Sequence, residues 1–192
     1  MRLPTPGLPL FALLAFGCSD PPPPLTGQAS WVDACASTAC ASTPHYVRAQ
    51  QGSPTAIVSC SLTPSNGGYS VSFTIAAIAN SGQTFDDSNE GLDVVGFLPA
   101  VAQEIRPQSA TIPGGVTVKG SGWTVRYATI GPSGNCHVFI DRLISGGFSG
   151  RISCSGLRDD GTMNPVMRTI RGNADAQNPD FGEFTFTNCS SG

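Results

Sequence analysis

The segment from Cys136 to Leu157 constrains the fold more than any other part of the chain. It contains two runs in which apolar and polar residues alternate, separated by a Ser-Gly-Gly break at residues 145–147. The apolar positions are Cys136, Val138, Ile140, Phe148, Ile152 and Cys154, with Phe139 and Leu143 as exceptions to the alternation. A period of two is typical of half-buried strands, and a glycine-rich break between two such runs predicts a β-hairpin.

The pairing register of this hairpin predicts a disulfide. If Val138 faces Ile152, the same register places Cys136 opposite Cys154. Cysteines that face each other on neighbouring strands lie within disulfide range, at about 5.5 Å between Cα atoms. We expect a three-residue turn at residues 144–146 to hold this register.

Further strands are predicted along the chain. Tyr69 to Ile78 alternates most regularly, with Val71, Phe73 and Ile75 on one face and small hydroxyl residues on the other. Residues 31–41 are interpreted as a loop stapled by its two cysteines, and residues 44–54 as a connection. Turn signals recur throughout, and no helical periodicity is sustained. The sequence therefore predicts an all-β fold, an antiparallel β-sandwich or partly closed barrel of about 8–9 short strands.

The composition fits such a fold and excludes one class of partner. The chain has 23 glycines and 16 prolines, which favour turns over long helices. Its net charge is −3, only 12% of its residues are charged, and Lys119 is the only lysine. Because there is no basic run, we expect no nucleic-acid partner.

Of the seven cysteines, one lies at the end of the apolar leader and six lie in the rest of the chain. Cys18 ends the apolar leader, and the disulfide candidates are Cys35, Cys40, Cys60, Cys136, Cys154 and Cys189. An even number in an exported domain predicts disulfides. Six cysteines permit 15 pairings, and the sequence alone does not choose among them. If Cys136 pairs with Cys154, we expect Cys35 and Cys40 to close a local loop and Cys60 to pair with Cys189. The absence of a Cys-x-x-Cys motif and the presence of only two histidines argue against zinc.

The first 17 residues have the features of a secretory signal: one arginine, an apolar run over residues 8–16, and small residues before Cys18. The stretch Leu14-Ala15-Phe16-Gly17-Cys18 resembles the lipobox of bacterial lipoprotein signals, although that family prefers leucine where Ala15 stands. The resemblance implies that Cys18 is acylated, with palmitate among the fatty acids, and becomes the mature N-terminus. Residues 15–17 also fit an ordinary signal peptidase, so simple secretion is the alternative.

These features predict three segments: a signal peptide at 1–17, a lipidated cysteine with a proline-rich tether at 18–30, and a single β domain at 31–192. Four consecutive prolines, residues 21–24, favour a stiff polyproline II spacer. The predicted location is the bacterial cell envelope, with the lipid in the outer membrane or a periplasm-facing membrane.

The acidic segment at residues 86–93 is the most distinctive candidate site. Its oxygen-bearing residues are weak calcium candidates: Asp86, Asp87, Asn89, Glu90 and Asp93. Calcium takes six to eight oxygen ligands, but the spacing does not follow the EF-hand pattern, because Gly91 stands where a ligand is needed. A solvated loop without metal is the preferred interpretation.

No catalytic motif is found. Cys136, His137 and Asp141 do not form a nucleophilic triad, because a disulfide-bonded cysteine is not a nucleophile and neighbouring strand residues point to opposite faces. Trp31 and Trp123 are expected to pack in the core rather than to stack on sugars. We therefore expect a non-enzymatic binding or envelope-structural module that needs no cofactor, with a protein or glycan partner left open. The alternative is a glycosidase-like hydrolase that uses the loop carboxylates Asp86, Asp87, Glu90 and Asp175.

Overall fold

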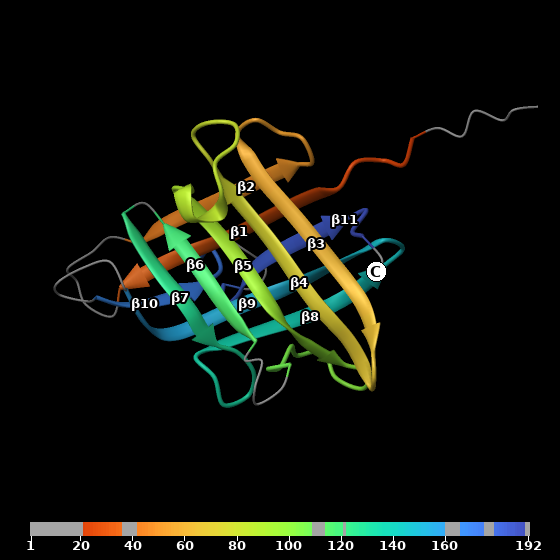
Figure 1. Cartoon of the computed structure of the whole chain (residues 1–192). Helices are drawn as coiled ribbons and strands as arrows, with labels where there is room; N and C mark the ends of the chain where they lie inside the picture. Colours follow the sequence, from red (N-terminus) through yellow and green to blue (C-terminus); the bar gives the residue numbers. More distant parts are fainter. Residues whose placement is uncertain are drawn as a thin grey trace, which may run out of the picture.

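The computed structural model describes residues 21–35, 42–108, 114–120, 122–159, 166–174 and 179–190. In these residues eleven β-strands form two antiparallel sheets that pack face to face (Figure 1). The all-β sandwich is therefore confirmed, with more strands than expected. The described helical structure is the 3-10 turn η1 (Phe85–Asp87). No helix in the described residues has the length and apolarity needed to cross a bilayer.

Sheet A is built around the first strand. Its members are β1 (Thr26–Cys35), β2 (Thr43–Gln50), β8 (Cys136–Ile144), β9 (Gly147–Arg158), β10 (Met167–Arg171) and β11 (Gly182–Thr187). One edge of β1 pairs with β2, and the other edge pairs first with β11 and then with β10. β9 pairs with both β10 and β11, and β8 pairs with β9.

Sheet B is a meander in which each strand pairs with the next one along the chain. Its members are β3 (Ala56–Ser65), β4 (Gly68–Ala77), β5 (Glu90–Pro99), β6 (Gly115–Gly120) and β7 (Trp123–Thr129). In Figure 1 its strands lie in front of sheet A and cross the sheet A strands steeply, as in orthogonal sandwich packing.

The two N-terminal strands correct the sequence interpretation. β1 occupies the region assigned to a tether and a stapled loop, and β2 occupies the region assigned to a connection. Within β2, alternate residues His45, Val47 and Ala49 are buried. This alternation is typical of a strand, but a histidine on the apolar phase and a proline at the start of the segment obscured it.

The hairpin register is confirmed. Val138 pairs with Ile152 and Cys136 with Cys154, and the two cysteines form a disulfide. The three-residue turn was wrong: Ile144 pairs with Gly147, so only Ser145 and Gly146 turn the chain. Gly146 has a φ of 70°, which glycine adopts at little cost. The register shifts between Ile140 and Arg142, and after this bulge Leu143 pairs with the buried Phe148, while Leu143 itself is 48% exposed.

The predicted Cys60–Cys189 disulfide is also present. Cys60 lies on β3 of sheet B, and Cys189 follows β11 of sheet A, so this bond ties the two sheets together. Cys35 is disulfide-bonded as well. Its predicted partner Cys40 lies outside the described residues, as does the proposed lipidation site Cys18.

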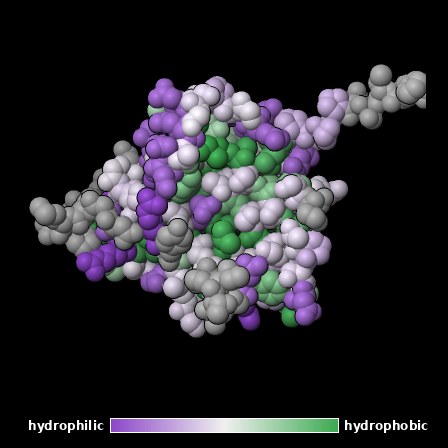
Figure 2. Space-filling model, viewed as in Figure 1, coloured by the Kyte–Doolittle hydropathy of each residue, from purple (hydrophilic) through white to green (hydrophobic). Residues whose placement is uncertain are grey.

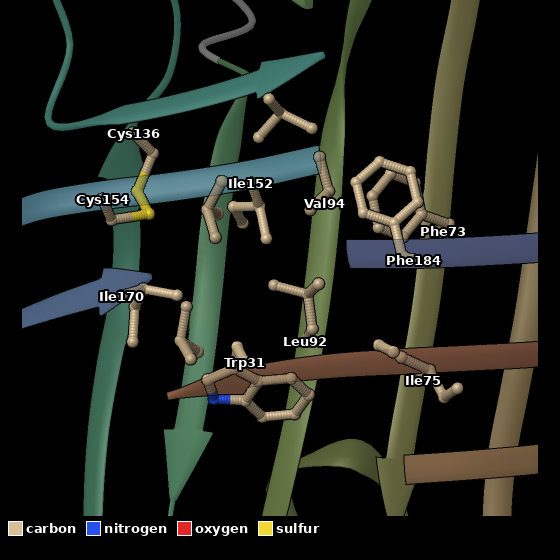
Figure 3. Packing of buried hydrophobic residues seen from close by; sticks show 14 of the residues in the cluster. Trp31, Phe73, Ile75, Leu92, Val94, Cys136, Ile152, Cys154, Ile170 and Phe184 are labelled. Carbon is tan, nitrogen blue, oxygen red and sulfur yellow. A yellow bond between two sulfur atoms is a disulfide. The ribbon is translucent and has the colours of Figure 1, made fainter. Parts of the chain in front are cut away.

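The inner faces of the two sheets form one apolar core (Figure 3). Phe73 on β4 lies at its centre, with ring centroids 4.6 Å from Phe184, 5.0 Å from Phe186 and 5.6 Å from Phe148. Trp31 and Trp123 are 2% and 5% exposed, which confirms that both tryptophans belong to the core.

Candidate functional site

The carboxylates of the acidic segment at residues 86–93 do not converge on one point. Asp86 forms an ion pair with Arg126 at 2.8 Å, and Asp87 accepts hydrogen bonds from the backbone N–H and hydroxyl of Thr84. The Thr84 hydrogen bonds lower the pKa of Asp87. Asp93 accepts a hydrogen bond from the hydroxyl of Thr74 at 2.6 Å, and burial raises the pKa of Asp93. Each carboxylate is therefore held by a different protein partner.

A lysine occupies the place where this segment presents its backbone oxygens. Lys119 on β6 donates from Nζ to the carbonyl oxygens of Phe85 and Asp86. Burial lowers the pKa of Lys119. The other calcium candidate, Asn89, lines a small neighbouring hollow of about 210 Å³. Within the described residues, no group of three or more His, Cys, Asp or Glu side chains is placed to hold a metal ion.

Glu90 leaves this segment and turns inward to a set of charged residues that we call the buried ion cluster. Its members are Asp33, His45, Glu90, Asp159 and Arg168. The cluster connects both sheets, because Glu90 begins β5 of sheet B whereas Asp33, His45 and Arg168 lie on sheet A strands. The fourth carboxylate proposed for a hydrolase, Asp175, lies outside the described residues.

His45 bridges two carboxylates. Its Nε2 lies 2.8 Å from Asp33 Oδ1, and its Nδ1 lies 2.7 Å from Glu90 Oε2. A neutral imidazole has only one N–H to donate, so satisfying both carboxylates requires the imidazolium. Burial by itself lowers the pKa of His45, but the hydrogen bonds and charges of Asp33 and Glu90 outweigh burial and raise that pKa.

Arg168 completes the cluster from β10. Its Nη1 donates to Asp33 Oδ2 at 2.7 Å, and its Nη2 lies 3.7 Å from Asp159 Oδ2. Its guanidinium stacks over Trp123, with 4.4 Å between Cζ and the ring centroid. On the other side, Trp31 stacks on the His45 ring at 5.1 Å between centroids.

This arrangement is more typical of an ion-pair network that joins the two sheets than of a catalytic centre. The side chains of His45 and Asp33 are only 3% and 2% exposed, and both imidazole nitrogens are engaged by carboxylates. A general base needs a nitrogen that can reach the proton of a substrate. The sequence interpretation missed the cluster because it placed His45 in a connection and Asp33 in a loop.

A second candidate site lies on the outer face of sheet A. We define the sheet A groove by outward residues on three neighbouring strands: Thr26, Gln28 and Ser30 on β1, Tyr46, Arg48 and Gln50 on β2, and Glu183, Thr185 and Thr187 on β11. Two adjoining hollows of about 530 and 60 Å³ share Gln28 and Thr185. A volume of several hundred Å³ is typical of ligand sites.

The groove combines small hydroxyl side chains with larger polar and aromatic ones. Thr26 on β1 and Thr187 on β11 hydrogen-bond to each other at 2.7 Å. Tyr46 on β2 is 59% exposed. Arg48 stands beside it, with Cζ 5.9 Å from the Tyr46 ring centroid and Nη2 3.4 Å from Gln28 Oε1. Most of this polar surface is therefore turned to solvent.

Beyond the groove, the guanidinium of Arg151 on β9 lies near two aromatic rings, Phe139 and Phe181, which contact each other at 5.8 Å between centroids. Its Cζ is 5.5 Å from the centroid of Phe139 and 5.0 Å from that of Phe181. Two hydrogen bonds to Asp141, at 2.7 and 2.9 Å, fix the guanidinium and raise the pKa of Arg151. This arrangement prolongs the polar and aromatic surface toward β8.

The outer face of sheet B has a different character. Figure 2 views the molecule from this side and shows apolar patches separated by polar residues. Val95 on β5 is exposed there, beside the outward hydroxyl residues of β4. The sheet A groove combines a hollow of about 530 Å³ with polar side chains, and we therefore take it as the candidate for ligand binding.

Comparison with known proteins adds no relative: no protein-family model, no curated protein and no solved structure matches the chain.

Proposed function

We propose that this protein is a lipid-anchored, extracytoplasmic binding module without catalytic activity, which uses the sheet A groove to hold a component of the bacterial cell envelope. The observation that carries the proposal is the groove: a hollow of about 530 Å³ lined by polar side chains on the outer face of a sheet. Other features of the chain support the membrane anchor and the absence of catalytic activity.

Attachment is supported by the order of the N-terminal segments. The lipobox-like sequence ends at Cys18, and the prolines at residues 21–24 are exposed and are separated from β1 by Leu25. The described chain before β1 extends away from the sandwich in Figure 1. The two described disulfide bonds support an oxidising compartment outside the cytoplasm.

The non-catalytic assignment is supported by the way the ionisable groups are used. Glu90, a carboxylate of the hydrolase alternative, is paired with His45, and Asp86 with Arg126. Among the residues that define the sheet A groove, Glu183 on β11 is the only carboxylate, and the other charged residue is Arg48 on β2. A glycosidase needs two carboxyl groups that face each other across a cleft.

The anchor is tested by a single substitution. The wild-type chain is expected to partition into detergent and to carry the added mass of acyl chains, whereas Cys18→Ser moves it to the soluble fraction. A wild-type chain that is soluble and unmodified contradicts the anchor and leaves simple secretion.

The groove is tested by co-sedimentation with isolated bacterial envelope material that is rich in peptidoglycan. The wild type is expected to sediment with this material, and Arg48→Ala to remain in the supernatant. Arg106→Ala is the matched control, because Arg106 is an exposed arginine that pairs with β5 of the other sheet. Equal sedimentation of both variants contradicts the groove as the binding surface.

A further inference from the structure

We infer that the sheet A groove binds an uncharged, hydroxyl-rich oligosaccharide. The inference rests on the proposed function and specifies its ligand class. It follows from the way strand register aligns side chains of different chemistry across the outer face of the sheet.

Strand register aligns one row of side chains across the sheet. Ser30 pairs with Tyr46 on one side and with Glu183 on the other, Glu183 pairs with Arg151, and Arg151 pairs with Phe139. The row therefore has an aromatic ring at each end, with a hydroxyl and two charged groups between them. Neighbouring strands are about 4.8 Å apart, so five strands span about 19 Å.

A second row runs beside the first. Gln28 pairs with Arg48 and with Thr185, and Thr185 pairs with Ser149. Glutamine offers both a donor and an acceptor, arginine offers donors only, and each hydroxyl can do either. The hydroxyl groups of a saccharide are also donors and acceptors, so both rows present complementary groups along their length.

Tyr46 supplies the apolar part of the site. Tyr46 is 59% exposed, pairs with Ser30 on β1 and lines the same hollow as Gln28. An aromatic ring of this kind buries apolar surface while its hydroxyl group remains hydrated. The C–H face of a sugar ring is the apolar surface that matches it, and the sugar hydroxyl groups then lie over Gln28 and Ser30.

The balance of charge selects a neutral ligand. Arg48 and Glu183 bring one positive and one negative charge to the groove, and Arg151 farther along the row is paired with Asp141. A polyanion requires several cations to replace its counterions. An extended peptide that joins a sheet does so at an edge, whereas this groove lies over the face of β1, whose two edges are already paired.

The experiment is calorimetric titration of the full chain, kept in a detergent without a sugar headgroup, with chitohexaose, cellohexaose and maltohexaose in turn. At least one oligosaccharide is expected to bind. Tyr46→Ala and Gln28→Ala are each expected to weaken that binding at least about tenfold. Tyr46→Phe retains the ring and is expected to stay within about threefold of the wild type, as is the control Arg106→Ala.

Two results overturn the inference. The first is the absence of binding by all three oligosaccharides. The second is binding that Tyr46→Ala and Gln28→Ala leave unchanged, because the site then lies elsewhere. Heparin separates the inference from the proposed function: if only heparin binds, and Arg48→Ala removes its binding, the ligand is a polyanion and the groove is still a binding surface.

Discussion

The buried ion cluster and the sheet A groove use opposite faces of the same two strands. β1 directs Asp33 inward and Gln28 outward, and β2 directs His45 inward and Arg48 outward. The inward groups are bonded to each other and to Glu90 and Arg168, whereas the outward groups keep most of their hydrogen-bonding capacity for solvent.

This difference shows how one pair of strands serves both stability and recognition. Charged groups removed from water need partners within the protein, and losing one partner leaves the others uncompensated. Exposed polar groups carry no such penalty, so they can be exchanged or bonded to a ligand. Substitutions on the inner face are therefore expected to affect folding, and those on the outer face to affect binding.

The largest expected effect comes from Asp33→Asn. The substitution keeps the shape of the side chain but removes the charge that faces both His45 and Arg168. Removing one partner of a buried ion pair costs about 3–5 kcal/mol of unfolding free energy. The matched variant on the outer face of the same strand, Gln28→Ala, is expected to change stability by no more than about 0.5 kcal/mol. Urea denaturation measures both values, and equal losses contradict the division between the two faces.

The disulfide of the β8–β9 hairpin is expected to have the next largest effect. Cys136 and Cys154 are separated by 18 residues in sequence, and replacing both with alanine removes about 3 kcal/mol on the chain-entropy model. Because the bond lies at the far side of sheet A from β2, ligand binding in the groove is expected to persist. A loss of less than about 1 kcal/mol contradicts the stabilising role of this bond.

A smaller effect is expected from pH. The pKa of His45 is raised above its unfolded value of 6.5, so its contribution to stability is complete below that pH and is lost as pH rises through the folded pKa. Thermal unfolding from about pH 6 to about pH 9 is expected to show a falling midpoint that His45→Gln makes less steep. His137→Gln is the control, because His137 pairs with Glu104 outside the cluster. A midpoint difference between wild type and His45→Gln that does not change with pH contradicts the bridging role of the imidazolium.

Much of the fold follows from alternation within single segments. The Tyr69–Ile78 pattern placed Val71, Phe73 and Ile75 in the core, where all three are fully buried. The hairpin pattern placed Cys136 opposite Cys154, and the preference for a local Cys35–Cys40 loop then suggested Cys60 with Cys189, although the sequence allowed other pairings. Apolar alternation is a local property, so the sequence alone reveals it.

The candidate sites were beyond such reasoning for two physical reasons. Asp33 and His45 are polar residues on the buried phase of their strands, which is the reverse of the pattern that identifies a strand. The groove depends on β2, β1 and β11 being neighbours, and β11 lies at the other end of the chain from β1. A period of two within one strand gives no information about which strand lies beside it.

The most direct test of the division between cluster and groove is proton–nitrogen correlation NMR during titration with the oligosaccharide that binds. The chain has two tryptophans, and both lie against the cluster, so their indole N–H signals report on that region. We expect the amide signals of Gln28, Arg48 and Thr185 to shift with ligand while the two indole signals stay in place. Shifts of the indole signals without shifts of these three amides would contradict the account.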